Sequence, residues 1–277
     1  MSNTLPSNNS PVSRRNFIIK SATTGIALGV AGIPRKASAE KSSDNNEKIR
    51  ALFVTGGGYH DYQSQKTILT EGVSKLIDVE WTIWHLDKAD EMKAALSKAG
   101  WADPFDVVVY SICHAHEKDS DYINSVVNVH KAGKAMVAIH CTMHSYHWEI
   151  GNGKNSKEDK EWNKLLGVVS LSHGTVGPPI RVTQTERKSN SYKPSNPEWK
   201  TPKGELYNIA SIYPSATVLA NGNNGESEHP VIWVNKYEKA NVFATSIGHH
   251  NETMEYPEFL KTIANGMVWA VNETAKA

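Results

Sequence analysis

Histidines follow short apolar segments at four points of the chain, and histidine is a common ligand of divalent metal ions. His60 comes after a run of three glycines, and His140 and His249 each follow a predicted strand. Neutral imidazole suits zinc and other borderline divalent metals, and a catalytic zinc needs about three protein ligands and one open position. We therefore predict that His60, His140 and His249 hold a divalent metal, zinc before manganese. His173 and Glu205 are further candidate ligands.

Residues near these histidines could move protons or bind a substrate. Carboxylate and imidazole groups serve as general acids and bases, and we predict this role for Asp61, Glu205 and His173. An aspartate in a turn is often a helix cap, so both roles stay open for Asp61. The predicted substrate-binding residues are Tyr59, His114, His144, Tyr207 and His250.

The two cysteines, Cys113 and Cys141, allow three interpretations. They are metal ligands, nucleophiles or small buried residues, and burial is favoured because cysteine is among the most buried residue types. A scaffold built on several disulfides is excluded by the count. The Gly56-Gly57-Gly58 segment lacks the sequence of a phosphate loop and the spacing of a dinucleotide-binding fingerprint. We predict a tight turn there that brings backbone close to a ligand.

Apolar runs alternate with helix-like segments through the first half of the chain. Strands are expected at 49–55, 79–86, 107–112 and 135–139, and helices at 63–76, 91–98 and 120–132. This alternation predicts an α/β protein with a parallel sheet and helices on both faces. Ligands bind outside the carboxyl ends of the strands in such a sheet, so the histidines should meet at one edge.

The second half of the chain has a less regular pattern. We expect a polar loop at 151–159, a short helix at 160–166, a long surface excursion at 185–204, strands at 216–220, 230–234 and 241–245, and a closing amphipathic helix at 256–271. The late strands are separated by Asn/Gly turns.

The N-terminal residues 1–39 have the three parts of a secretory signal peptide in order. Ser13-Arg14-Arg15-Asn16-Phe17-Ile18-Ile19-Lys20 resembles the twin-arginine export motif, an apolar run follows, and Ala37-Ser38-Ala39 is a small-x-small cleavage site. A disordered basic tail is the alternative. We expect a twin-arginine signal peptide at 1–39, a linker at 40–48, one domain at 49–272, and a periplasmic or secreted location. The apolar run is shorter than the 20 or so residues that span a bilayer, and the sequence holds no second apolar stretch of that length, so no membrane insertion is expected after signal removal.

The charge of the chain disfavours nucleic acid as a partner. Removing residues 1–39 takes away five basic residues and no acidic ones, which changes the formal net charge from +1 to −4. A mildly acidic domain without a basic run is a poor nucleic-acid binder.

Several motifs resemble the ThuA-like (trehalose utilisation) family in the order of the chain. They are Phe53-Val54-Thr55-Gly56-Gly57-Gly58-Tyr59-His60-Asp61, Asp106-Val107-Val108-Val109, Gly133-Lys134-Ala135-Met136-Val137-Ala138-Ile139-His140, Leu171-Ser172-His173, Gly204-Glu205-Leu206-Tyr207, His229-Pro230-Val231-Ile232-Trp233, Gly248-His249 and Gly266-Met267-Val268-Trp269-Ala270. The resemblance implies a flavodoxin-like three-layer α/β/α sandwich with a mostly parallel sheet, as in class I glutamine amidotransferases. It also implies a role in carbohydrate catabolism, since the family is associated with sugar oxidoreductases that make 3-keto-disaccharides.

The resemblance also bears on the cysteines. His140 occupies the position of the amidotransferase nucleophile, and Cys141 falls one residue late, which argues against thiol catalysis and for metal ligation at this elbow. Twin-arginine substrates are typically exported already folded, so the chain would fold among reduced thiols. We therefore expect two free cysteines rather than a Cys113–Cys141 disulfide.

Three functions remain open on these grounds. The first is an exported metal-dependent enzyme acting on a sugar or a 3-keto-glycoside, of isomerase, lyase or hydrolase type. The second is a non-catalytic carbohydrate-binding protein on a degenerate amidotransferase-like fold, and the third is a Cys141 thiol hydrolase. The expected partner is a carbohydrate substrate, and the sequence is compatible with a homo-oligomer and with a functional partnership with a sugar oxidoreductase.

Overall fold

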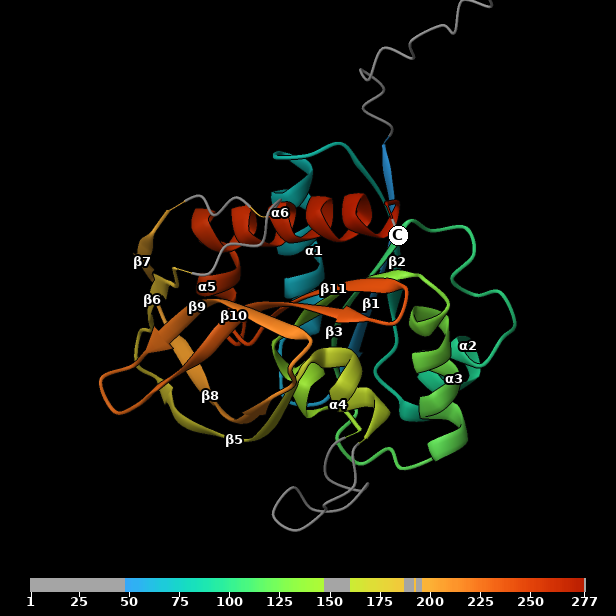
Figure 1. Cartoon of the computed structure of the whole chain (residues 1–277), viewed down its shortest axis with the longest axis horizontal. Coiled ribbons are helices and arrows are strands. Elements are labelled where there is room, and N and C mark those ends of the chain that lie inside the picture. Colours follow the sequence, from blue (N-terminus) through green and yellow to red (C-terminus); the bar gives the residue numbers. More distant parts are fainter. Residues whose placement is uncertain (1–47, 147–159, 187–191, 193–195, 277) are drawn as a thin grey trace, which may run out of the picture. The chain divides into compact units, whose positions relative to one another are not determined.

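The computed structural model describes residues 48–146, 160–186, 192 and 196–276 (Figure 1). The predicted signal peptide at 1–39, the linker up to residue 47 and the polar loop at 151–159 lie outside the described residues. Within the part of the chain that is described, no helix combines the length and the apolar character needed to cross a membrane.

Five parallel strands form one half of a nine-stranded sheet. In spatial order they are β2 (Val79–His85), β1 (Ile49–Gly57), β3 (Val107–Cys113), β4 (Ala135–Ile139) and β11 (Ala240–Thr245). The register places Leu52, Val108, Met136 and Val242 side by side across four of these strands. Because the strands are parallel and in register, their carboxyl ends meet at the same edge of the sheet.

Alternate rows of side chains in these strands pack into two separate cores. The row of Leu52 belongs to one core, and the adjacent row of Phe53 and Val109 belongs to the other. Helices α1 (Tyr62–Ser74) and α6 (Pro257–Thr274) cover one face, and α2 (Ala89–Leu96), α3 (Ser120–Lys131) and α4 (Glu161–Leu166) cover the other (Figure 1). Strands β1, β3, β4 and β11 are buried on both faces, which explains their continuous apolar sequences, whereas β2 at the edge of the sheet is partly exposed.

The other half of the sheet is antiparallel. It continues from β11 through β10 (Glu228–Tyr237), β9 (Ala216–Asn223), β6 (Arg181–Gln184) and β7 (Glu198–Lys200). A separate antiparallel pair joins β5 (Val168–Gly177) to β8 (Gly204–Ile212). The predicted α/β sandwich is therefore confirmed, with a sheet that is mixed and whose first strands are parallel.

The predicted surface excursion at 185–204 is wrong for part of its length. Within it, Tyr192 and Trp199 are buried, and Trp199 belongs to β7. Tyr192 stacks on Phe243 with 5.4 Å between ring centroids, and Trp199 stacks on Tyr256 at 5.9 Å. Two large aromatic side chains bury enough apolar area to anchor a segment whose composition is otherwise polar.

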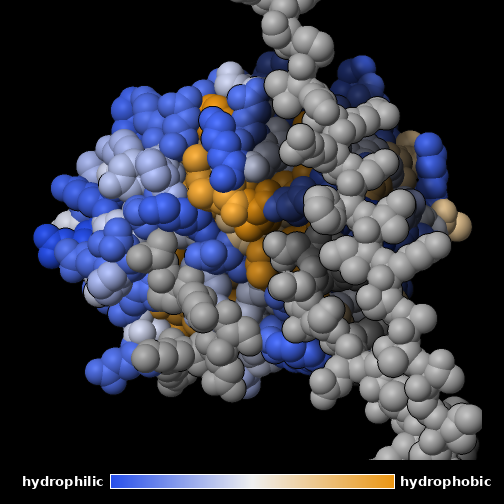
Figure 2. Space-filling view, turned by 90° about the horizontal axis from the view of Figure 1, so that it is seen from above, coloured by the Kyte–Doolittle hydropathy of each residue, from blue (hydrophilic) through white to orange (hydrophobic). Residues whose placement is uncertain are grey.

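Two short elements follow strand ends and carry site residues. The 3-10 helix η1 (His140–His144) comes directly after β4, and α5 (Asn251–Met254) comes shortly after β11. Among the residues coloured by hydropathy in Figure 2, hydrophilic side chains predominate and apolar side chains gather near the middle of the face.

Gly57 at the end of β1 is a position where a side chain has no room. Its φ is +106°, and a Cβ there would lie 2.3 Å from the carbonyl oxygen of Cys113 on the neighbouring strand. We expect Gly57→Ala to lower the free energy of unfolding by about 2–4 kcal/mol, measured by urea denaturation. Gly58→Ala is the matched control, because a Cβ there would meet no described atom within 4 Å. It should change stability by less than about 0.5 kcal/mol, and equal losses in both variants would contradict the prediction.

His130 of α3 should make the stability pH-dependent. Its ring is fully buried, its Nδ1–H donates to the Lys134 carbonyl at 2.8 Å, and its Nε2 accepts from the Tyr110 hydroxyl at 3.0 Å. Burial lowers the pKa of His130 to about 4. As the pH falls from about 6.5 to 4, only the unfolded chain takes up this proton, so up to about 3 kcal/mol of stability is lost. The free energy of unfolding, measured by urea denaturation at each pH, should not show this loss in His130→Gln. The same dependence on pH in His130→Gln and in the unaltered protein would contradict the prediction.

Candidate functional site

A cavity of about 320 Å³ lies at the carboxyl edge of the parallel strands. Segments that follow β1, β3, β4 and β11 contribute to it, together with the β5–β8 pair. Its lining includes seven of the residues predicted from sequence, namely Tyr59, His60, His144, His173, Glu205, Tyr207 and His249. The edge predicted for the site is therefore the edge where these residues meet.

The three predicted metal ligands lie together at this edge. One ring nitrogen from each of His60, His140 and His249 falls within 4.8 Å of the others. The ring centroid of His60 lies 5.0 Å from that of His140 and 4.7 Å from that of His249. Gly248, with φ at +131°, allows the loop after β11 to pass close to His140, because a Cβ there would press on Ile139 at 3.1 Å.

The backbone of the loop around His140 sets the orientation of its ring. His140 has a positive φ of 47° at the elbow after β4, and its Nδ1 lies 2.6 Å from the carbonyl oxygen of Ser246. Since a carbonyl only accepts, Nδ1 carries the proton and Nε2 faces the other histidines. A metal-binding histidine commonly donates its second N–H to a backbone carbonyl in this way. Ser246 was not predicted as a site residue.

Glu205 of β8 links three of the histidines. Its Oε2 lies 2.9 Å from His140 Nε2 and 2.9 Å from His249 Nδ1, and its Oε1 lies 3.1 Å from His173 Nδ1. The Tyr207 hydroxyl is also 3.3 Å from His140 Nε2. The carboxylate is almost fully buried, so it depends on these partners to offset the loss of its hydration.

The donor set fits a divalent cation. His140 Nε2, His249 Nδ1 and Glu205 Oε2 lie 2.9–3.3 Å apart, and imidazole nitrogens and a carboxylate oxygen at such distances must be separated by protons or by a cation. Two atoms that each lie about 2.0–2.1 Å from a tetrahedral zinc are about 3.3 Å apart. Among the described residues, neither ring nitrogen of His60 has a hydrogen-bond partner, although both are buried. A buried imidazole nitrogen without a hydrogen-bond partner beside this cluster is expected of a side chain that binds a metal ion.

The charges in the cavity favour neutral imidazole next to an ionised carboxyl. Burial, followed by the nearby His140 and His249, lowers the pKa of His60 to about 2. Burial alone would raise the pKa of Glu205, but its contacts with His140 and His249 hold that pKa well below its usual range. Deprotonated imidazole and carboxylate are the forms that bind metals.

His173 is placed to exchange protons at the mouth of the cavity. Its Nδ1 faces two acceptors, the Gly174 carbonyl at 2.9 Å and Glu205 Oε1 at 3.1 Å. Two acceptors on one side keep the proton on Nδ1 and leave Nε2 for exchange. The side chain is 45% exposed, so a substrate can reach it.

The residues predicted to bind substrate separate into two groups. Tyr59, His144 and Tyr207 line the cavity, and His144 stacks on Tyr207 with 3.9 Å between ring centroids while its Nε2 bonds to Ser170 Oγ at 2.8 Å. His114 instead lines a neighbouring cavity of about 520 Å³. His250 packs against His249 at 4.4 Å between centroids and is not part of the cavity lining.

Asp61 acts as a helix cap in the structure. Its Oδ1 accepts from the Ser64 backbone N–H at 3.1 Å at the start of α1, and its Oδ2 accepts from Asn251 Nδ2 at 2.8 Å. These bonds, the one from Asn251 first, lower the pKa of Asp61. Both carboxylate oxygens are engaged and the residue is outside the cavity lining, so the structure does not bring Asp61 to the predicted catalytic group.

The two cysteines form a disulfide, which corrects the expectation of free thiols. Cys113 and Cys141 are bonded, with 5.3 Å between their Cα atoms. Cys113 ends β3 and Cys141 follows β4, and these strands are hydrogen-bonded neighbours. The two cysteines are 28 residues apart in the sequence, but the pairing of β3 with β4 brings their side chains within bonding range. The expected burial of both cysteines is confirmed.

Comparison with known proteins supports the motifs noted in the sequence. Residues 50–270 match the family model described as ThuA, trehalose utilisation. A structure described as a ThuA-like protein from Parabacteroides merdae is 17% identical, with a TM-score of 0.62 over 81% of this chain and 90% of that one. A second, from Bacteroides uniformis, is 16% identical, with a TM-score of 0.56 over 80% of this chain and 91% of that one.

One further likeness is weaker, and the search of curated sequences gave none. A protein from Thermoplasma acidophilum described as part of a GMP synthase is 14% identical, with a TM-score of 0.49 over 83% of this chain and 98% of that one. No curated protein sequence matches the chain significantly. At their identities the likenesses to the two ThuA-like structures concern the fold alone.

Removing one of the clustered histidines should weaken metal binding. We expect His140→Ala or His249→Ala to reduce zinc affinity by about 100-fold or more, because replacing even outer-shell partners of a metal ligand costs about 10–100-fold. Competition titration with a chromophoric chelator measures the affinity. His229→Gln is the control, since His229 lines a separate cavity. Equal zinc affinities in all three variants and the unaltered protein would exclude this cluster as the metal site.

Proposed function

Because the chain belongs to the ThuA family, which is linked to trehalose utilisation, we propose that it is a metal-dependent enzyme acting on a sugar or a 3-keto-glycoside. The observation that carries the proposal is the cluster of His60, His140 and His249 around the buried carboxylate of Glu205, beside an open cavity. Isomerisation, elimination and hydrolysis of such a substrate all fit this arrangement.

The residues that would hold the metal are His60, His140 and His249, with Glu205 beside them. A bound divalent ion, zinc before manganese, supplies a Lewis acid that polarises a carbonyl or hydroxyl oxygen of the substrate. Glu205 keeps the imidazoles of His140 and His249 oriented and offsets positive charge in the cluster.

Proton transfer is assigned to His173. Its Nδ1 proton is held by Glu205 and the Gly174 carbonyl, so its Nε2 can take a proton from the substrate or return one to it. The same Glu–His contact would stabilise the imidazolium that forms. Asp61 has no part in this step, because its oxygens cap α1 and bind Asn251.

Sugar binding is assigned to the aromatic residues of the cavity. Tyr59 lines it with 71% of its surface exposed, an unusual state for a large aromatic side chain. Aromatic rings present apolar faces that suit the C–H face of a sugar. Tyr207 is buried, so its contribution is limited to its hydroxyl and to its stacking with His144.

Export belongs to the proposal as well. The twin-arginine motif at residues 13–20 supports a periplasmic or secreted location, where the enzyme would act on the product of a sugar oxidoreductase.

The enzyme proposal is tested by turnover of a 3-keto-glucoside. Removing metal with a chelator should abolish turnover, and adding zinc or manganese should restore it. His173→Gln should lower kcat by roughly 10²–10⁴-fold, the usual contribution of a general acid or base, while the metal content stays unchanged. His229→Gln, which alters a histidine of a separate cavity, is the matched control and should keep its rate within about two-fold.

The outcomes separate the competing functions. Sugar binding that persists in His140→Ala, with no turnover by the unaltered protein, would favour the non-catalytic carbohydrate-binding alternative. Turnover that survives complete metal removal but is lost in Cys141→Ser would favour a thiol hydrolase instead. The disulfide between Cys113 and Cys141 leaves no free thiol for that mechanism in the structure as it stands.

A further inference from the structure

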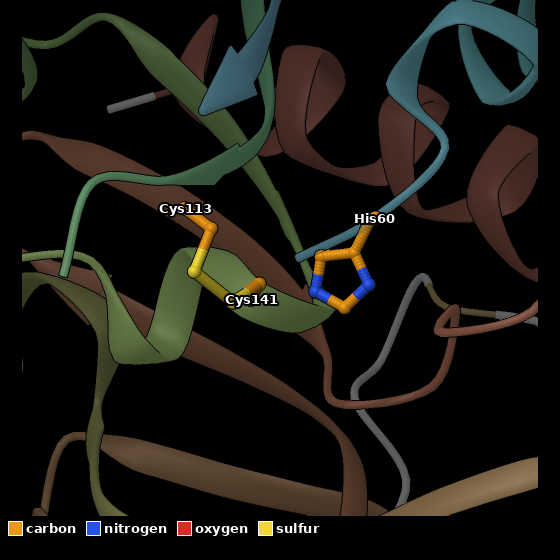
Figure 3. Close-up of side chains that lie close together, drawn as sticks. All are labelled: His60, Cys113 and Cys141. Carbon is orange, nitrogen blue, oxygen red and sulfur yellow. A yellow bond between two sulfur atoms is a disulfide. The ribbon is translucent and has the colours of Figure 1, made fainter. Parts of the chain in front are cut away.

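The disulfide lies beside the candidate metal ligands and shares their cavity. Cys113, Cys141 and His60 all line it, and Figure 3 shows the His60 ring next to the sulfur–sulfur bond, with one ring nitrogen on the side of the cysteines. One ring nitrogen of His60 and the two sulfur atoms fall within 4.8 Å of one another. Cysteine sulfur and imidazole nitrogen at such distances are a ligand set that suits zinc and other soft or borderline metals.

His60 belongs to two possible ligand groups at once. It lies within ligand distance of His140 and His249 on one side and of the two cysteines on the other. Among the described residues, both of its ring nitrogens lack a hydrogen-bond partner. The ring of Tyr62 packs against it edge-on, at 5.5 Å between centroids, and offers no polar contact of its own. The unsatisfied nitrogens of His60 are therefore free for either group.

We propose that reduction of the Cys113–Cys141 disulfide creates a second metal site, formed by the two thiolates and His60. Reduction breaks the sulfur–sulfur bond, and two electrons and two protons convert it into two thiols. In a cell a dithiol supplies both and is itself oxidised to a disulfide. The incoming divalent metal then displaces one proton from each thiol, and the imidazole of His60 completes a set of three protein ligands with one open position.

The cysteine backbones are held in place by contacts other than the disulfide. The Cys113 carbonyl accepts from the Gly58 N–H at 3.2 Å, and the Cys141 carbonyl accepts from the Ser145 N–H at 3.0 Å. Strands β3 and β4 remain paired just before these residues, as at Tyr110 and Ala138. Reduction would therefore leave the two side chains facing each other.

The spacing of the cysteines suits a shared metal. Two sulfurs bound to one zinc are at most about 4.6 Å apart, twice the zinc–sulfur bond length. Side chains on Cα atoms 5.3 Å apart reach that separation by rotating about the Cα–Cβ bonds, without backbone movement. The sulfurs border a cavity, so a metal can enter.

The two sites compete for His60, a consequence that rests on the proposed three-histidine centre. With the disulfide intact, His60 is available to His140 and His249. With the disulfide reduced, the thiolates draw a metal and His60 toward themselves. The redox state of the cysteines would thus decide which group of ligands is complete.

Cobalt(II) titration tests the second site, because thiolate ligands give cobalt a near-ultraviolet charge-transfer band that imidazole does not. The full-length protein is titrated with its disulfide intact and after treatment with a trialkylphosphine. The phosphine leaves as its oxide, with oxygen and both thiol protons coming from water. We expect the band only after reduction, saturating at one cobalt per chain. Cobalt binding by reduced protein without this band would overturn the proposal.

Variants assign the band to its ligands. Cys113→Ser/Cys141→Ser should lose the band, and circular dichroism confirms that it is folded. His60→Ala should keep a band but require at least about 10-fold more cobalt to saturate it. An unchanged cobalt affinity in His60→Ala would remove His60 from the site and overturn the proposal as stated.

A third variant separates this proposal from the proposed function. His140→Ala/His249→Ala removes two ligands of the three-histidine centre and none of the thiolate site. We expect it to keep the charge-transfer band after reduction, at a cobalt affinity no weaker than that of the unaltered protein, because the competing ligands of His60 are gone. Loss of the band would overturn the proposed thiolate site. The band can persist in this variant while the unaltered protein shows no turnover of the 3-keto-glucoside. That pair of results would contradict the proposed enzyme and support the thiolate site.

Discussion

The register of the parallel strands is the constraint on which the candidate site depends. β1, β3, β4 and β11 are paired in one continuous parallel block, so the segments that follow them emerge at one edge. His60, His140 and His249 come from three of these segments and are separated by many residues in the chain. The apolar rows that fix the register are buried on both faces, and a slip by one residue would turn each row toward the wrong core.

The antiparallel β5–β8 pair contributes the buried carboxylate of Glu205 to the site. Glu205 comes from β8, which pairs with β5 in a two-stranded sheet outside the main sheet. A buried carboxylate without partners would cost several kcal/mol or would take up a proton. Here three imidazoles surround it, and its pKa stays below its usual range. The same carboxylate thereby joins the clustered histidines to His173 at the cavity mouth.

The disulfide lines the cavity, and its redox state would decide whether the cavity contains thiolate ligands. Bonded to each other, Cys113 and Cys141 offer no thiolate, and the clustered ligands beside them are the imidazoles of His60, His140 and His249. As thiols they would present soft ligands next to a histidine that has no hydrogen-bond partner in the described structure. Backbone hydrogen bonds hold both cysteines, and β3 pairs with β4 just before them, so we expect the fold to survive reduction of the disulfide.

The sequence by itself determined the α/β fold class, the parallel strands and the edge where the histidines gather. Continuous apolar runs mark doubly covered strands, and the residues that follow such strands share one edge, so His60, His140 and His249 could be grouped without coordinates. Only the tertiary structure decided which side chains touch. It bonded the second carboxylate oxygen of Asp61 to the distant Asn251, buried Trp199 and Tyr192 in a polar segment, and joined Cys113 to Cys141. Each of these depends on contacts between distant segments, which local periodicity does not encode.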